Sequence, residues 1–200
     1  MNHEELLLQR AKDGDLAAFG ELVRLYEKKV YALTLRMCKH PEDAAEAAQE
    51  AFLAAWQGLK FFRGEASFST WLYRLASNAC VDLLRRESRL RRAAGPSLDD
   101  EGVYLDVADS APSPHAIAES NELKQQIEEG LRTLSPEHRE VLILREIHQL
   151  SYDEIAQALS LDSGTVKSRI SRGRKQLRNF LLKSGNFSPP GTSKHTGKEG

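Results

Sequence analysis

The sequence predicts an all-α protein that consists of two small helical domains joined by a flexible acidic linker. In both halves of the chain, apolar residues recur three or four positions apart, which is the spacing of an amphipathic helix. No run of alternating apolar and polar residues is long enough for a sheet. The composition also changes abruptly between the two halves, and this change marks the linker.

The first domain is expected to span residues 1–92. Apolar residues keep the helical spacing from Leu16 to Met37. The following segment, PEDAAEAAQEAFLAAWQGL, is rich in alanine and begins with Pro41, which suits the first turn of a helix. The segment STWLYRLASNACVDLLRRESRLRR continues the pattern through Trp71 and Leu83. We therefore expect this domain to contain helices only.

Charge is strongly segregated although the net charge of the 200 residues is only -1. Residues 85–92 hold five arginines and one glutamate, whereas residues 95–120 hold six acids and neither lysine nor arginine. Together with its glycines and prolines, the acidic stretch predicts a flexible linker over residues 93–120. Residues 184–200 are rich in Gly, Pro and Ser, and we predict a disordered tail there.

The second domain is expected to span residues 121–183 and to end in a helix-turn-helix. Ser135 and Pro136 have the types preferred at a helix start, and Ser151 and Glu154 have the spacing of a capping box. A short helix beginning there is followed by the turn LDSG and then by a longer basic helix. In a helix-turn-helix the second helix enters the major groove of DNA.

The basic helix has two chemically different faces. At 100° per residue, Val166, Ile170 and Leu177 share one stripe with Gly173 beside them, and this is the expected buried face. Hydroxyl and guanidinium groups on the opposite face could bond base edges, and the flanking bases could hold phosphates. The alternative is a solvated face that is merely basic. The free face and its flanks comprise Thr165, Ser168, Ser171, Arg172, Lys175, Lys167, Arg174, Arg178, Arg169 and Gln176.

Several classes of protein are disfavoured by the sequence. No apolar run approaches the roughly 18 residues of a membrane span, and the N-terminus is acidic where a secretory signal would be basic, so we expect a cytoplasmic protein. Cys38 and Cys80 are expected to be buried free thiols. His138 and His148 have no acid at metal-motif spacing, and no phosphate loop or nucleophile motif is present. We expect no cofactor, no metal and no enzymatic activity.

Taken together, these segments resemble the extracytoplasmic-function (ECF) group of bacterial RNA polymerase sigma factors. The run LSYDEIAQALSLDSGTVKSRISRGRKQLR is similar to region 4 of that group. The run AAQEAFLAAWQGLKFFRGEASFSTWLYRLASNACVDLLRR is similar to region 2. The resemblance covers residues 15–92 and 121–182 and implies a subunit without catalytic activity. Such a subunit binds core RNA polymerase, reads the minus-35 element with region 4 and melts the minus-10 element with region 2.

The helical faces and the resemblance together predict three sets of site residues. The set for the minus-35 element is Thr165, Lys167, Ser168, Arg169, Ser171, Arg172, Arg174 and Lys175. The set for the minus-10 element is Phe62, Arg63, Gly64, Glu65, Ser67, Phe68, Trp71, Arg74, Asn78, Arg85 and Arg86. The set for core polymerase is Glu46, Gln49, Glu50, Leu53, Phe52 and Trp56, of which Phe52 is also expected to be partly in the core.

The resemblance also implies partners. They are core RNA polymerase, through its largest-subunit coiled coil and its flap, promoter DNA in duplex and melted form, and an anti-sigma factor; free of them the protein is expected to be a monomer. The acidic linker could lie in the polymerase's basic RNA channel or serve only as a tether. The alternative function is a stand-alone helix-turn-helix transcription regulator. Such a regulator would bind duplex DNA alone and would not need the F-R-G and T-W-L-Y-R blocks of the first domain.

Overall fold

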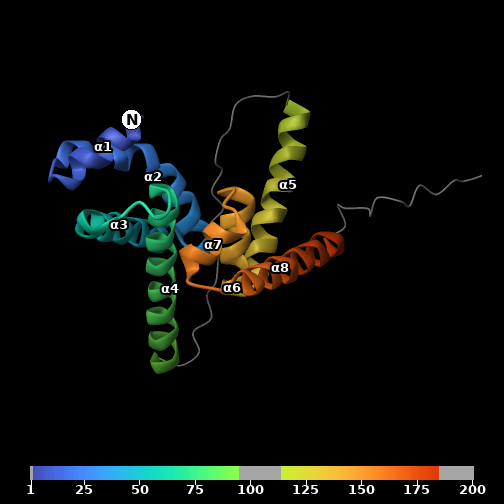
Figure 1. The fold of residues 1–200 in the computed structure, drawn as a ribbon. Coiled ribbons are helices and arrows are strands. Elements are labelled where there is room, and N and C mark those ends of the chain that lie inside the picture. The colour runs from blue at the N-terminus through green and yellow to red at the C-terminus, as the bar shows by residue number, and fades with distance from the viewer. Residues whose placement is uncertain (1, 95–113, 185–200) are drawn as a thin grey trace, which may run out of the picture.

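The computed structural model describes residues 2–94 and 114–184, and all regular secondary structure in these two ranges is helical (Figure 1). The predicted all-α fold is therefore confirmed. The elements of the first half are α1 (His3–Lys12), α2 (Leu16–Cys38), α3 (Pro41–Gly58), the 3-10 turn η1 (Leu59–Phe61) and α4 (Phe68–Ala94). Those of the second half are α5 (Pro114–Thr133), α6 (Pro136–Leu142), the π-helical turn η2 (Ile143–Ile147), α7 (Tyr152–Leu159) and α8 (Ser163–Lys183).

Short polar side chains start most of these helices. Asp15 accepts hydrogen bonds from the N–H groups of Ala17 and Ala18 and so caps α2. Pro41 occupies the first turn of α3, as predicted. Ser67 Oγ accepts from the N–H of Thr70 at 3.1 Å, just ahead of α4. These bonds satisfy amide groups that have no partner inside the helix.

Two helix starts were predicted in the second half, and a side-chain capping bond is present at one of them and absent at the other. The capping box of α7 is confirmed, because Ser151 Oγ accepts from the N–H of Glu154 at 3.2 Å and the Glu154 carboxylate accepts from the N–H of Ser151 at 2.8 Å. The N–H and the hydroxyl of Ser151 both donate to the Glu154 carboxylate, and these two bonds lower the pKa of Glu154. Ser135 does occupy the N-cap position of α6, but its hydroxyl lies 3.0 Å from His138 Nδ1 and makes no capping bond.

The turn before α8 uses different residues from those the sequence pattern indicated. The left-handed residue is Ser160, with φ 53°. Asp162 is the N-cap, and its carboxylate accepts from both the N–H and the hydroxyl of Thr165, which lowers its pKa. Gly164 therefore belongs to the first turn of α8 instead of to the connection.

The helices extend into the stretch that was expected to be linker. Helix α4 continues to Ala94, past the expected end of the first domain at residue 92. Helix α5 begins at Pro114, and a proline with φ set near −65° is well suited to a first helical position. Residues 114–120 therefore belong to a helix. The rest of the predicted linker, residues 95–113, and the predicted tail from residue 185 lie outside the described residues.

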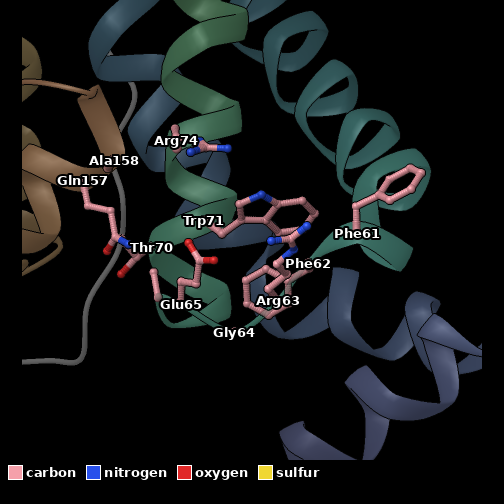
Figure 2. A pocket seen from close by; sticks show the side chains of 11 residues that line it. Phe61, Phe62, Arg63, Gly64, Glu65, Thr70, Trp71, Arg74, Gln157 and Ala158 are labelled. Carbon is pink, nitrogen blue, oxygen red and sulfur yellow. The ribbon is translucent and has the colours of Figure 1, made fainter.

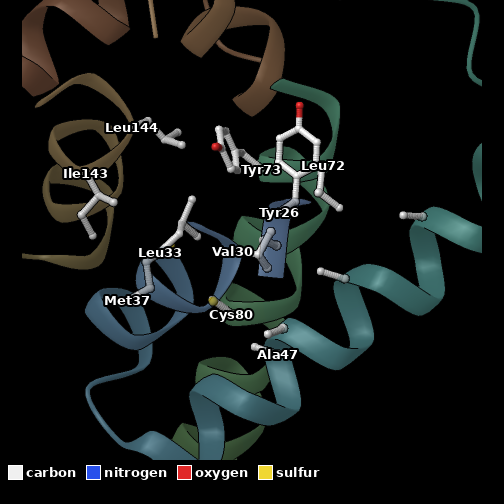
Figure 3. Close-up of a cluster of buried hydrophobic side chains, with 14 of the residues drawn as sticks. Tyr26, Val30, Leu33, Met37, Ala47, Leu72, Tyr73, Cys80, Ile143 and Leu144 are labelled. Atoms are coloured by element: carbon white, nitrogen blue, oxygen red, sulfur yellow. The ribbon is translucent and has the colours of Figure 1, made fainter. Parts of the chain in front are cut away.

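Helix α2 lies at the centre of the molecule. Its Val30, Leu33 and Met37 are at most 2% exposed and pack against Leu72 and Cys80 of α4 (Figure 3). Small residues of α3, which include Ala44, Ala47, Ala51 and Ala55, are fully buried. A stripe of alanines lets α3 approach α2 and α4 closely. The alanines of this segment therefore allow close packing of α3 and also favour its helical conformation.

The buried cluster continues into the second half of the chain. Ile143 and Leu144 of η2 belong to the same hydrophobic cluster as α2 and α4 (Figure 3). Both cysteines are free and buried, as predicted. A hydrogen bond with Cys38 and burial raise the pKa of Cys80. Within the described ranges, no helix is both long and apolar enough to span a bilayer.

Candidate nucleic-acid interfaces

Helix α8 presents the polar face that its sequence predicts. Val166, Ile170 and Gly173 are buried, and Leu177 is half-buried. A Cβ atom at Gly173 would lie 3.1 Å from Leu142 and 3.3 Å from the carbonyl oxygen of His138, so α8 approaches α6 very closely at this point. The opposite face is open to solvent. Its exposed residues include Lys167, Ser168, Ser171, Arg172, Arg174 and Lys175.

The two arginines at the edges of this face are held by acids of neighbouring elements. Arg169 lies 3.0 Å from Glu137 of α6, and its side chain is only 26% exposed. Arg174 donates two hydrogen bonds, of 2.9 and 2.6 Å, to Oε1 of Glu146 in η2. Each pair ties one flank of α8 to the rest of the domain and offsets one positive charge.

Three other basic residues of α8 have no partner among the described residues: Lys167 on one flank, and Arg172 and Lys175 on the free face. Within the described part of the chain, Lys167, Arg172 and Lys175 form no ion pair or hydrogen bond. Ser168 donates to the carbonyl of Thr165 at 2.9 Å, which leaves the lone pairs of its hydroxyl available. The structure thus separates the free Arg172 and Lys175 from the paired Arg169 and Arg174, a distinction that the helical wheel does not contain.

A pocket of ≈ 280 Å³ lies where the end of α3 meets the start of α4 (Figure 2). It combines aromatic rings with charged groups, as the sequence predicted for this segment. The predicted residues that line it are Phe62, Arg63, Gly64, Glu65, Trp71 and Arg74. Further lining residues that sequence reasoning missed are Phe61, Ala66, Thr70, Gln157 and Ala158. Phe61 directly precedes the FRG block, so its place in the sequence could have indicated that it lines the pocket. Gln157 and Ala158 belong to α7, and nothing in the sequence indicates that they lie near this block.

A cluster of tilted aromatic rings lies at this pocket, and Phe62 and Trp71 of the cluster line it. The ring centroids of Phe62 and Trp71 are 4.9 Å apart, and those of Phe68 and Trp71 are 5.8 Å apart. A Cβ atom at Gly58 would lie 3.3 Å from the Trp71 ring, so the absence of a side chain there lets Trp71 lie against the end of α3. Lys12 Nζ lies 5.2 Å from the centroid of Phe62. The rings are therefore held in place before any ligand arrives.

Two residues of the predicted minus-10 set lie beside the pocket and do not line it. Phe68 is 3% exposed and its ring packs against that of Trp71, so it is not available for stacking on a base. Ser67 caps the start of α4 through Thr70 and contacts Ser69. Gly64 has φ 75°, a left-handed conformation that glycine adopts at low cost, and this bend carries the chain around the pocket.

The remaining predicted DNA contacts lie farther along α4. Asn78, Arg85 and Arg86 are exposed. Arg86 donates a 2.5 Å hydrogen bond to Glu46 of α3, whereas Arg85 lies 3.7 Å from Asp82 of its own helix. Glu46 was assigned to the polymerase-binding surface, so the structure brings two surfaces into contact that the sequence treated separately.

Helix α3 carries the predicted polymerase surface. Glu46, Gln49, Glu50 and Leu53 are exposed, and Leu53 is the most apolar of them at 48% exposure. Phe52 is half-buried against the core, which confirms the expectation that it is partly a core residue. Trp56 also packs inward, with its ring centroid 5.0 Å from that of Phe19.

Comparisons with known proteins agree on both halves of the chain. Residues 22–90 match the model of sigma-70 region 2, and residues 124–177 match that of sigma-70 region 4. The chain is 35% identical over 176 residues to the ECF RNA polymerase sigma factor SigW of Bacillus subtilis (strain 168), with 87% of this chain and 94% of that protein covered. It is 34% identical over 182 residues to the ECF RNA polymerase sigma-E factor of Escherichia coli (strain K12), with 88% and 93% covered.

Solved structures of similar fold agree with these matches. The structure of CnrH in complex with the cytosolic domain of CnrY has a TM-score of 0.65 and 27% identity, and the match covers 92% of this chain and 99% of that one. The sigma factor RpoE in complex with the anti-sigma factor NepR from Bartonella quintana has a TM-score of 0.67 and 22% identity, with 82% and 96% covered, and it shows the similarity of fold alone.

Proposed function

Because the chain belongs to the ECF group of RNA polymerase sigma factors, we propose that its two nucleic-acid surfaces divide promoter recognition between them. As a sigma factor, the protein directs promoter-specific transcription initiation by RNA polymerase. We assign it no catalysis of its own and place its work in the cytoplasm, where the polymerase acts. A stand-alone regulator is disfavoured because region 2 accounts for the whole of residues 22–90.

The α8 face reads the minus-35 element. Its support is the exposed polar face, in which Arg172 can make a bidentate contact to guanine, the Ser171 hydroxyl can bond either kind of base edge and the Ser168 hydroxyl can accept from a base donor. Lys167 and Lys175 hold phosphates, which contributes affinity and salt dependence. Arg169 and Arg174, each paired with a glutamate, position the helix and reach the DNA backbone from its edges.

The pocket between α3 and α4 holds a base of the melted minus-10 element, and the aromatic and charged lining of the pocket is the observation that supports the proposal most strongly. An unpaired base needs a flat apolar surface and nearby polar groups. Trp71 and Phe62 supply the surface, and Glu65, Arg63 and Arg74 supply the polar groups. Asn78, Arg85 and Arg86 extend the contact along α4 toward the backbone of the duplex.

The exposed face of α3 docks on the coiled coil of the largest polymerase subunit. Glu50 and Gln49 provide charge and hydrogen bonds, and Leu53 provides an exposed apolar side chain in the same stripe. We expect Glu50→Lys to weaken capture of core polymerase in a pull-down, because it reverses a charge at the centre of this stripe. Glu27→Lys is the control, since Glu27 is an exposed acid on a different helix, α2.

An anti-sigma factor is a further proposed partner. Two proteins of similar structure have been solved with partners, RpoE in complex with the anti-sigma factor NepR and CnrH in complex with the cytosolic domain of CnrY. The flap of the polymerase is the proposed partner of the second domain. For the acidic stretch we keep the RNA-channel hypothesis. Neutral substitutions at Asp99, Asp100, Glu101, Asp106 and Asp109 then impair initiation, and unchanged transcript yield and promoter escape would refute it.

The experiment that tests the proposed function is in vitro transcription with purified core polymerase and genomic DNA fragments. Transcript starts are mapped with and without the protein. New starts that share two short upstream motifs would support the proposal and identify the promoter sequence. Absence of new starts, combined with binding of the protein alone to duplex DNA, would favour the stand-alone regulator.

A further inference from the structure

Phe61 and Phe62, at the end of η1, each have a lysine ammonium against the ring. Lys60 Nζ lies 4.9 Å from the ring centroid of Phe61, and Lys12 Nζ lies 5.2 Å from that of Phe62. An ammonium at this distance is attracted by the electron-rich face of the ring. A ring that can stack on a base, with a cation beside it that can bind phosphate, is the combination by which proteins hold a single-stranded nucleotide.

The 3-10 turn η1 directs the two rings to different sides. Side chains three positions apart in such a turn lie on the same side. Leu59 is 1% exposed, and Phe62, whose N–H donates to the carbonyl of Leu59 at 3.0 Å, packs against the ring of Trp71. Leu59 and Phe62 therefore form the inner side of the turn. Lys60 and Phe61 are left on the outer side, where both are exposed.

Phe61 lines the pocket and is nevertheless 72% exposed. Figure 2 shows its side chain at the end of α3, pointing away from the ring of Trp71. Among the residues that the structure describes, no other aromatic ring packs against it. A ring exposed to this extent adds little to the hydrophobic core. Because the two rings diverge, a base that lies on Trp71 leaves the ring of Phe61 uncovered.

The surface around Phe61 is suited to a phosphate. Lys60 and Arg63 are both exposed, and neither pairs with an acid in the ranges that the structure describes. Arg74 lines the pocket as well, and Glu65 is the acid among the lining residues. Cations without internal partners are available to the phosphates of a strand and give its binding a dependence on salt.

We propose that Phe61 and Lys60 form a second nucleotide site beside the pocket. This site holds the nucleotide that adjoins the one in the pocket, with its base on the ring of Phe61 and its phosphate at the ammonium of Lys60. The inference rests on the proposed function, because it takes the pocket to hold a base of the melted strand. Two consecutive bases, not one, are then held by the first domain once the duplex has opened.

The test measures binding of a single-stranded oligonucleotide that carries the minus-10 element of a mapped promoter. Fluorescence anisotropy reports its affinity for the holoenzyme assembled from core polymerase and the full chain. We expect Phe61→Ala to weaken binding about tenfold, because stacking on one ring is lost, and Phe61→Trp to bind like the wild type. Leu16→Ala is the matched control, since Leu16 is 67% exposed and lies at the start of α2.

An abasic series separates a second site from a wider pocket. Each nucleotide in turn is replaced by one that lacks a base, and removal of a ring costs nothing more at the position which that ring serves. We expect Trp71→Ala and Phe61→Ala to lose their effects at two adjoining positions.

The phosphate contact is tested by the slope of log affinity against log salt concentration. We expect Lys60→Ala to make this slope shallower by about 0.7, which corresponds to one phosphate of a single strand. Lys60→Arg keeps the charge and should keep the slope. Lys28→Ala is the matched control, because Lys28 is an exposed lysine of α2.

Three results would overturn the proposal. Unchanged affinity in Phe61→Ala, together with weaker binding by Trp71→Ala, would remove the second site and leave the proposed function intact. Loss of both effects at the same abasic position would place Phe61 in the site of Trp71. Weaker capture of core polymerase by Phe61→Ala in a pull-down would make the ring a contact of the polymerase. Unchanged affinity in both variants would refute the proposed role of the pocket as well.

Discussion

The pocket at the start of α4 and the face of α8 differ in shape and in how their side chains are held. The pocket is concave, and its rings are held by packing, with Trp71 wedged between Phe62, Phe68 and the side-chain-free Gly58. The α8 face is convex and fully solvated at its centre, and it is arranged by the helix period alone. A preformed pocket suits a single base held in one pose, whereas a polar helix face suits a groove read at several positions.

The difference also bears on energetics. Groups in the pocket lose little conformational freedom on binding because they are already ordered. Lys167 and Arg172 are long side chains without internal partners, and they become ordered only on DNA. Substitutions in the pocket should therefore act mainly on melting, and substitutions on α8 mainly on affinity and its dependence on salt.

The largest effect is expected from Trp71→Ala. Stacking on an aromatic side chain is worth roughly 1 to 3 kcal/mol per base, so promoter opening should fall by about 5- to 150-fold while duplex binding changes little. Permanganate footprinting of the melted strand measures opening, and Trp71→Phe, which retains a ring, is the matched control. Opening that is unchanged in a folded Trp71→Ala protein would mean that the ring serves only the core.

An intermediate effect is expected from Arg172→Ala. Loss of one bidentate base contact costs about 1 to 2 kcal/mol, which corresponds to about a tenfold loss of affinity for the minus-35 element and to weaker discrimination at one base. Arg174→Ala is the matched comparison, because Arg174 is tied to Glu146 and should cost less. Binding titrations over a range of salt measure both. Equal losses in the two variants would remove the distinction between the free and the paired arginine.

The smallest effect is expected from His148, whose ring centroid lies 4.4 Å from that of Tyr73 in the first domain, and it is an effect on stability. Burial, with Arg36 and Lys29 nearby, lowers the pKa of His148 from 6.5 to about 4. The unfolded chain thus takes up a proton that the folded protein does not, so the stability due to this residue is full above pH 6.5 and falls as the pH drops toward 4. His148→Phe should remove this loss of stability. The loss is measured by urea unfolding as the difference in the free energy of unfolding between pH 7 and pH 5.

Glu140 acts in the opposite sense and must be separated from His148. Burial raises the pKa of Glu140, so its protonation at low pH stabilises the folded protein. The wild type and His148→Phe share Glu140, and the difference between them isolates the histidine. An identical dependence on pH in both proteins would show that His148 is not held neutral by the interface.

Much of the fold was readable from local pattern. The period of apolar residues predicted the helices and the buried stripe of Val166, Ile170 and Gly173, and the spacing of Ser151 and Glu154 predicted their capping box. Each of these depends on residues within one or two turns of a helix, where geometry follows directly from sequence spacing. The residue types of the FRG and TWLYR blocks likewise predicted an aromatic and charged surface there.

The sequence by itself determined the helical class, the two DNA-directed segments and the chemistry that each of them carries. Only the tertiary structure decided that Phe68 is buried, that Arg169 is paired with Glu137 and that Gln157 lines the pocket. These contacts join residues far apart in the chain, and no periodicity within a single segment specifies which distant segment will pack against it. The arrangement of the two domains is set by side-chain packing and by the hydrogen bond from Arg139 to the Met37 carbonyl at the end of α2, and both exist only once the helices are assembled.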